Sequence, residues 1–331
     1  MRIELQELRG LEREQEIPFD ELVQIIEQAI QSAYLKHSLE RGFGTLESEE
    51  VRVVVDRSSG EVNVHVPEKD DEGNVIGEAE VTTDEFGRIA ASAAKQVINQ
   101  RLRDLADDQV LGAFKDKEGE IVSGVVQQGP NPRMVHVDLG QLEAILPPEE
   151  QVPGEEYKHG SRIRVYVTSV SKGLKGPQVV VSRTHPQLVR KLFALEVPEI
   201  ADGVVEIVSL AREAGHRTKV AVSSKDPAIN AKGTCIGEMG RRVRAVMAEL
   251  GEEKIDIVDY SPDLNTFVTN ALSPAKVTEA FTLNKELKQV RALVPDFQLS
   301  LAIGKEGQNA RLAAKLTGAK IDIQPDSIMN D

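Results

Sequence analysis

A short block of sequence occurs twice in the last part of this 331-residue chain, and it limits the possible folds more than any other feature. Each copy has an isoleucine, Ile236 or Ile303, directly followed by Gly-x-x-Gly and a helix-like segment. A glycine, Gly251 or Gly318, comes next, and the run Lys-Ile-Asp-Ile follows shortly after it. One Gly-x-x-Gly is common by chance, but two with matching flanks indicate an internal repeat. The chain therefore contains two copies of one small folding unit.

Strand-like segments precede both blocks. Residues 204–211 and 216–223 lead into the first block, and residues 277–283 and 287–294 lead into the second. Each unit is therefore predicted to run strand, strand, helix, Gly-x-x-Gly, helix, strand. This order resembles the bacterial, type II form of the KH module, whose Gly-x-x-Gly loop clamps the backbone of single-stranded nucleic acid. We expect two type II KH domains in tandem.

The chemistry of these loops follows from the helix that begins at each of them. Its free N–H groups and the positive end of its dipole attract anions such as phosphate, and glycine lets the phosphate come close. Glu238 and Glu306 repel phosphate, so we expect modest affinity per loop and stronger binding from linked modules. The alternative is a tight helix–helix turn without a ligand. The predicted RNA-binding residues are Gly237, Glu238, Met239, Gly240, Arg241, Arg242 and Arg244 in the first copy, and Gly304, Lys305, Glu306, Gly307, Gln308, Asn309, Arg311 and Lys315 in the second.

Residues 118–184 change to a period of two, which is typical of half-buried strands. Five short strands separated by glycine and proline turns favour a small barrel of the OB type, and their landmarks resemble the S1 domain. The predicted strands are residues 121–126, 134–139, 142–146, 162–167 and 178–182. We expect Arg133, His136 and Arg183 to contact RNA, although such faces usually stack bases on aromatic side chains, which are scarce here. The alternative is a spacer barrel with weak RNA contact.

The first 117 residues hold most of the acidic excess. They contain 14 Lys and Arg against 26 Asp and Glu, a net charge of −12, whereas residues 118–331 have 26 against 28, a net charge of −2. Helices are predicted over residues 17–40 and from Phe86 to about Asp108, with a hairpin of strands 51–55 and 62–66 between them and an exposed loop over 68–73. An acidic domain favours basic protein surfaces over phosphate, although solubility alone is an alternative.

The sequence gives no sign of an enzyme. Six histidines are spread without metal-like spacing, and the paired acidic residues lie in polar segments typical of solvated loops. We therefore predict no catalytic residue, no cofactor and no metal site. The single Cys235 excludes an internal disulfide, fits a reducing cytosol and is expected to be a buried structural thiol. No apolar run approaches the length that a bilayer needs, and Met1 does not open a signal peptide, so we expect a cytoplasmic protein without a membrane partner.

Longer motifs resemble the NusA family of bacterial transcription factors over essentially the whole chain. An insertion at residues 230–233 resembles actinobacterial members, and the acidic C-terminal repeats that some members carry are not expected here. Many members have arginine at Met239 or its neighbour. The most specific stretches are residues 182–186 (Ser-Arg-Thr-His-Pro), 195–200 (Leu-Glu-Val-Pro-Glu-Ile), 212–215 (Arg-Glu-Ala-Gly), 271–276 (Ala-Leu-Ser-Pro-Ala-Lys) and 295–304 (Pro-Asp-Phe-Gln-Leu-Ser-Leu-Ala-Ile-Gly).

The resemblance implies an α+β multidomain protein with four parts. These are an N-terminal RNA polymerase-binding domain (1–117), an S1 domain (118–184), a linker helix with the first KH domain (185–275) and the second KH domain (276–331). It implies a monomeric elongation factor that binds RNA polymerase core and nascent single-stranded RNA, joins other antitermination factors, and modulates pausing, intrinsic termination and antitermination.

Two other functions remain open at this point. KH and S1 modules also occur in RNA-processing exoribonucleases, but there KH precedes S1 behind a large catalytic core. A free-standing RNA chaperone would need the same RNA modules and no polymerase.

Overall fold

The computed structural model describes residues 2–15, 17–40, 50–69, 75–81, 84–129, 131, 133–173, 176–251 and 253–329. The chain divides into two compact units, one up to Gln109 and one from Val110 onward. In the described part of the chain, no helix is both long and apolar enough to span a bilayer.

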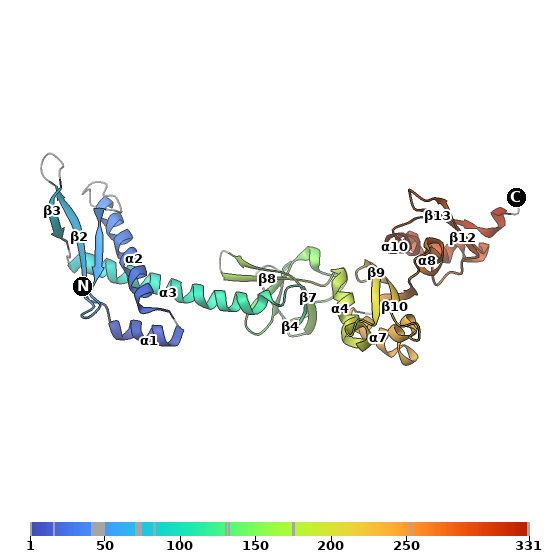
Figure 1. Cartoon of the computed structure of the whole chain (residues 1–331), viewed down its shortest axis with the longest axis horizontal. Helices are drawn as coiled ribbons and strands as arrows, with labels where there is room; N and C mark the ends of the chain where they lie inside the picture. The colour runs from blue at the N-terminus through green and yellow to red at the C-terminus, as the bar shows by residue number, and fades with distance from the viewer. Residues whose placement is uncertain are drawn as a thin grey trace. The chain divides into compact units, whose positions relative to one another are not determined.

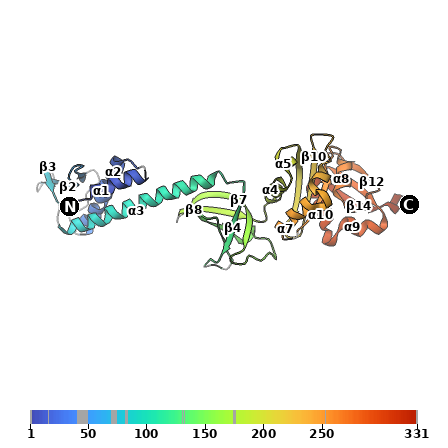
Figure 2. The same ribbon diagram turned by 90° about the horizontal axis from the view of Figure 1, so that it is seen from below.

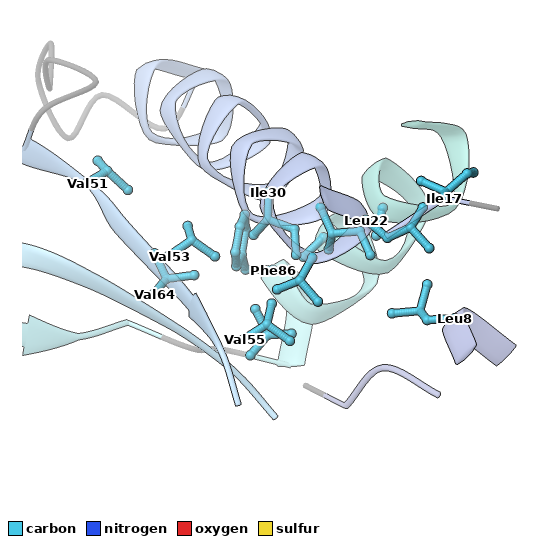
Figure 3. Packing of buried hydrophobic residues seen from close by; sticks show 14 residues of the cluster. Leu8, Ile17, Leu22, Ile30, Val51, Val53, Val55, Val64 and Phe86 are labelled. Carbon is cyan, nitrogen blue, oxygen red and sulfur yellow. The ribbon is translucent and has the colours of Figure 1, made fainter. Parts of the chain in front are cut away.

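The first unit packs helices on a small antiparallel sheet. Its elements are α1 (Leu5–Gln15), α2 (Phe19–Glu40), β1 (Arg52–Val55), β2 (Val62–Lys69), β3 (Val75–Glu80) and the start of α3 (Asp84–Lys115). The sheet has the order β1-β2-β3. Leu22 and Ile30 of α2 pack with Val53 and Val55 of β1 and with Phe86 of α3, because the apolar residues recur at helical spacing in one element and at every second position in the other (Figure 3).

The sequence prediction for this unit was incomplete. It missed α1 and β3, and α3 continues beyond Asp108 to Lys115. The loop expected over residues 68–73 was wrong at Glu68 and Lys69, which belong to β2, while residues 70–73 lie outside the described residues. The last turns of α3 belong to the second unit, where Val110 and Phe114 pack into the core of the barrel.

The second unit begins with a closed five-stranded barrel, which confirms the predicted OB-type fold (Figure 1, light green). Its strand order is β4-β5-β6-β8-β7. Alternate residues face inward, such as Val165 and Val167 on one strand and Val179 and Val181 on another. The strands are β4 (Ile121–Gln127), β5 (Val135–Asp138), β6 (Glu143–Leu146), β7 (Arg162–Gly173) and β8 (Gly176–Ser182), and a short 3-10 turn, η2 (Pro148–Glu150), follows β6.

The two repeats have the same architecture, which confirms the type II order (Figure 2, yellow to red). In each repeat the first two strands pair antiparallel and the last strand pairs parallel to the middle one. The first repeat contains α4 (Pro186–Glu196), α5 (Pro198–Ala201), β9 (Val205–Glu213), β10 (Arg217–Ser224), α6 (Ala231–Ile236), η3 (Glu238–Gly240), α7 (Arg241–Glu249) and β11 (Lys254–Asp259). The second contains α8 (Leu264–Ala271), β12 (Glu279–Asn284), β13 (Gln289–Val294), η4 (Asp296–Gln298), α9 (Leu299–Ile303), η5 (Lys305–Gly307), α10 (Gln308–Thr317), β14 (Lys320–Pro325) and η6 (Asp326–Met329).

The repeats share a hydrophobic core. Ala211, Ala221 and Val258 of the first repeat belong to the same cluster as Val268 and Leu312 of the second. The fully buried Lys219 adds a polar connection, because its Nζ donates to the carboxylate of Asp256 and to the carbonyl oxygen of Ser273 beyond α8. The two loops are therefore carried on packed, neighbouring supports. The predicted domain boundaries at residues 117, 184 and 275 stay predictions.

Candidate nucleic-acid interface

The two Gly-x-x-Gly loops have the same backbone conformation. The first glycine has φ/ψ of 73°/171° at Gly237 and 79°/168° at Gly304. The third position is left-handed in both copies, with 50°/25° at Met239 and 53°/26° at Glu306. Because two different loop sequences adopt one strained conformation, the surrounding helices impose it.

The first glycine of each loop is required by the residue five positions later. A Cβ atom on Gly237 would lie 2.7 Å from the Arg242 side chain, and one on Gly304 would lie 2.8 Å from the backbone nitrogen of Asn309. Arg242 and Asn309 are equivalent residues of the two repeats, and both lie beneath their loop. This close contact leaves no room for a side chain at the first glycine, where the start of the second helix meets the end of the first.

The helix after each loop begins without a side-chain cap. Gly240 precedes α7 and Gly307 precedes α10, and neither offers a side-chain acceptor to the first turn. The positive dipole end of each helix therefore meets solvent at the loop. By contrast, Asn230 caps α6 by accepting from the N–H of Gly233 at 2.9 Å. The sequence thus leaves the loop-facing helix ends open to an anion.

The first loop carries two exposed arginines, Arg241 and Arg244, that form no ion pair with a described residue. Arg242 has a different role, because its guanidinium lies 3.0 Å from the Glu199 carboxylate and 2.9 Å from the Thr234 carbonyl oxygen. Met239 is 87% exposed at the tip, beside the exposed Glu238. The predicted cations of this loop are therefore divided into two that face solvent and one that is held within the fold.

The second loop presents its cations differently. Lys305 and Lys315 are exposed and form no ion pair with a described residue. Arg311 Nε lies 2.6 Å from one carboxylate oxygen of Glu213, and Gln308 Nε2 lies 2.9 Å from the other. Glu213 ends strand β9 of the first repeat, so this carboxylate reaches the loop from the neighbouring domain.

Asn309 does not fit its predicted role as a reader of base edges. Only 1% of this residue is exposed, and its side-chain amide donates to the carbonyl oxygens of Leu272 and Ala302 at 3.0 Å and 2.9 Å. The structure corrects the prediction because the amide fastens α10 to the elements beneath the loop. We leave Asn309 out of the proposed RNA surface.

The barrel residues differ in their availability. Arg133 is exposed, whereas the His136 ring is mostly covered and pairs with Glu143 on the neighbouring strand. The structure contradicts the prediction that Arg183 contacts phosphate, because the Arg183 side chain is only 3% exposed and pairs with Glu155. Its guanidinium is buried and bonded to other parts of the protein, so we leave Arg183 out of the proposed RNA surface as well.

A cleft lies beside each loop. The first, about 690 Å³, has a lining that includes Pro198, Asn230, Gly237, Arg241 and Arg242. The second, about 670 Å³, lies at the contact between the two repeats, and its lining includes Arg217 and Lys254 of the first repeat with Gly304 and Lys305 of the second. Both clefts are open, polar and bounded by a loop, which suits an extended charged ligand.

Sequence reasoning missed Glu199 and Glu213 as partners of the loop cations. Glu213 lies 98 residues before Arg311, and nothing local in the sequence indicates that they meet. The Arg-Glu-Ala-Gly stretch at residues 212–215 contains Glu213, but it indicated only the family and not this contact.

Comparison with known families matches models of four domains to the chain. The model of the NusA N-terminal domain matches residues 5–69 and 66–108, and that of the S1 RNA binding domain matches residues 115–182. Models of the NusA-like first and second KH domains match residues 183–260 and 264–331.

Named relatives match almost the entire chain. Transcription termination/antitermination protein NusA of Mycobacterium tuberculosis (strain ATCC 25618 / H37Rv) is 51% identical over 334 residues, which cover 99% of this chain and 94% of that protein. The protein of the same name in Bacillus subtilis is 46% identical, covering 98% of this chain and 91% of that protein. The one in Thermus thermophilus is 40% identical, covering 97% and 89%. The chain therefore belongs to the NusA family of transcription termination/antitermination proteins.

Proposed function

We propose that this chain is a transcription elongation factor that binds nascent single-stranded RNA and RNA polymerase core. In this role it modulates pausing, intrinsic termination and antitermination. The observation that supports RNA binding most is the pair of loops with one backbone conformation, each followed by an uncapped helix and exposed cations. Two such loops on packed supports bind one strand more tightly than either loop alone.

The proposed RNA surface follows the exposed side chains. Arg241 and Arg244 contact phosphates at the first loop, and Lys305, Arg311 and Lys315 do so at the second. The strand follows the backbone of the two loops, Gly237–Gly240 and Gly304–Gly307. The side chains that border its path are Glu238, Met239, Glu306 and Gln308. The exposed Arg133 of the barrel extends this surface, whereas His136, which is mostly covered and paired with Glu143, does not belong to it.

The first unit is proposed to anchor the polymerase. Residues 1–117 carry a net charge of −12, which disfavours RNA and favours a basic protein surface. The separation of charge thus supports different partners for the two parts of the chain. We further propose that the protein works as a monomer in the cytoplasm, together with other antitermination factors.

The mechanism requires binding and no catalytic residue. A bound factor changes the balance between paused and elongating states only by binding them unequally. A factor fixed to the polymerase holds the transcript at a high effective concentration, so modest affinity at each loop is sufficient.

The test is the lifetime of a hairpin-stabilised pause with purified bacterial RNA polymerase. We expect the full chain to lengthen the pause and a fragment of residues 110–331 to have little effect. The fragment starts at Val110 because Val110 and Phe114 pack into the barrel core. An equal effect of the fragment would contradict the anchoring role of the first unit, and no effect of the full chain would contradict the elongation function.

A further inference from the structure

The two loops differ in whether one equivalent arginine forms an ion pair. A shift of 67 residues superposes Gly237 on Gly304 in the sequence, and the same shift pairs Arg244 with Arg311. Arg244 is exposed and forms no ion pair with a described residue. Arg311 Nε lies 2.6 Å from the carboxylate of Glu213. One loop therefore has an available guanidinium where the other has an occupied one.

Glu213 contacts the second loop in the way that a phosphate would. Its two carboxylate oxygens accept from different donors, Arg311 Nε and Gln308 Nε2, at 2.6 Å and 2.9 Å. Both donors lie in the first turn of α10, directly behind the loop. The hydrogen bond from Arg311 holds the pKa of Glu213 below its ordinary value, so the carboxylate is charged at neutral pH. An anion already binds the place where an RNA phosphate would be attracted.

The surroundings of this contact are cationic and open. The adjoining cleft is lined by Lys254, Lys305, Arg311 and the carboxylates of Glu213 and Glu306. Arg217 also lines it, but its guanidinium pairs with Asp256 at 2.7 Å. The Glu213 side chain is 20% exposed and the Arg311 side chain is 47% exposed, so solvent and ligands reach the pair. An ion pair of this exposure is weak enough for a phosphodiester to replace.

We propose that Glu213 is an internal competitor for RNA at the second loop. In the RNA-free protein its carboxylate neutralises Arg311 and takes two donors that a backbone phosphate would use. The incoming strand must displace it, which makes the second loop the weaker of the two. This inference rests on the proposed function, because it concerns the same RNA surface, and it assigns the difference between the loops to one carboxylate.

The other role for Glu213 is a strut that holds the two repeats in place. The two roles predict opposite results. Removal of a competitor tightens RNA binding, whereas removal of a strut weakens it because the loops lose their arrangement. Glu213→Gln separates them, since the amide keeps the size of the side chain and an acceptor oxygen but loses the charge.

The experiment measures the affinity of the full chain for a fluorescein-labelled oligouridylate over a range of salt concentrations. The oligonucleotide should exceed about eight nucleotides, because one KH loop clamps four. The matched control is Glu286→Gln, which removes one exposed carboxylate from the turn between β12 and β13 and changes net charge equally. Both variants are also made in an Arg311→Gln background.

We expect Glu213→Gln to bind about two- to fivefold more tightly than Glu286→Gln, the ratio that corresponds to an exposed ion pair. The slope of log affinity against log salt should steepen by up to about 0.7, the value for one additional phosphate contact on a single strand. The gain should disappear when Arg311 is absent. Unchanged or weaker binding by Glu213→Gln, or an equal gain without Arg311, would overturn the inference while leaving the proposed function intact. A wild-type chain that does not bind the oligonucleotide would overturn both.

Discussion

Arg183 and Glu249 lie 66 residues apart in the chain, yet Arg183 Nη2 donates to the backbone carbonyl oxygen of Glu249 at 2.9 Å. The other terminal nitrogen, Nη1, donates to the carbonyl oxygen of Arg164 in β7 at 2.9 Å. The same guanidinium pairs with Glu155 in the loop between the barrel strands β6 and β7. One buried arginine thus joins the barrel to the end of helix α7, and this explains why it is unavailable to RNA.

Replacement of Arg183 by methionine is expected to destabilise the second unit by about 3 kcal/mol, because it leaves the Glu155 carboxylate without its cation in a mostly covered site. Denaturant unfolding measures the change. The control is Arg162→Met, which removes an exposed arginine from the same barrel and should change stability by less than about 0.5 kcal/mol. Equal effects of the two substitutions would show that Arg183 does not hold this junction together.

Substitution of Arg241 and Arg244 by glutamine is expected to weaken RNA binding uniformly across sequences. Each lost phosphate contact should reduce the salt slope by about 0.7. Lys285→Gln, in the turn between β12 and β13 and away from both loops, removes a similar charge and should leave the slope nearly unchanged. Fluorescence anisotropy titrations at several salt concentrations measure both values. A slope that stays the same in the double variant would contradict phosphate binding by the first loop.

Alanine at Gly304 is expected to cost more stability than alanine at Gly307. Both glycines have positive φ, 79° and 73°, but a Cβ atom at Gly304 would lie 2.8 Å from the backbone nitrogen of Asn309, whereas a Cβ at Gly307 meets nothing within 4 Å. Gly307→Ala should therefore cost only the left-handed conformation, about 1–2 kcal/mol. Thermal unfolding ranks the two variants. The reverse order would indicate that the backbone beneath the loop yields easily.

Cys235 is expected to resist thiol reagents in the folded protein. Burial raises its pKa to about 12, and the side chain lies within the core of the first repeat. At pH 8 the thiolate is therefore rare and inaccessible, so labelling should proceed only through unfolding. Titration with a chromogenic disulfide, with and without denaturant, measures the rate. Rapid labelling of the native chain would contradict the buried position of this thiol.

The sequence predicted the barrel and the repeats because their patterns are strong. Apolar residues at every second position indicate the barrel strands. The Gly-x-x-Gly unit occurs twice with matching flanks, so a chance match is excluded. Strand β3 and helix α1 were missed because their signals are weak. Val75–Glu80 contains a glycine and two glutamates, and its described residues are mostly exposed, while Leu5–Gln15 is strongly polar.

The site residues show where such reasoning ends. Residue type and spacing indicate that Arg183, Arg242 and Arg244 are cations, but not which of them reaches solvent. That depends on carboxylates contributed from elsewhere, such as Glu155 for Arg183 and Glu199 for Arg242. Burial of Asn309 depends likewise on the backbone of Leu272, which lies 37 residues earlier. These pairings are long-range, so no local pattern encodes them.

The left-handed third position of each loop leaves the protein short of its maximal stability. Met239 and Glu306 hold a conformation that is unfavourable for ordinary side chains and well tolerated by asparagine. Asparagine at both positions would be expected to raise the melting temperature without changing a core contact or a cation. A thermostable form of the chain for structural work can therefore start from these two surface residues, since the rest of each loop keeps its backbone.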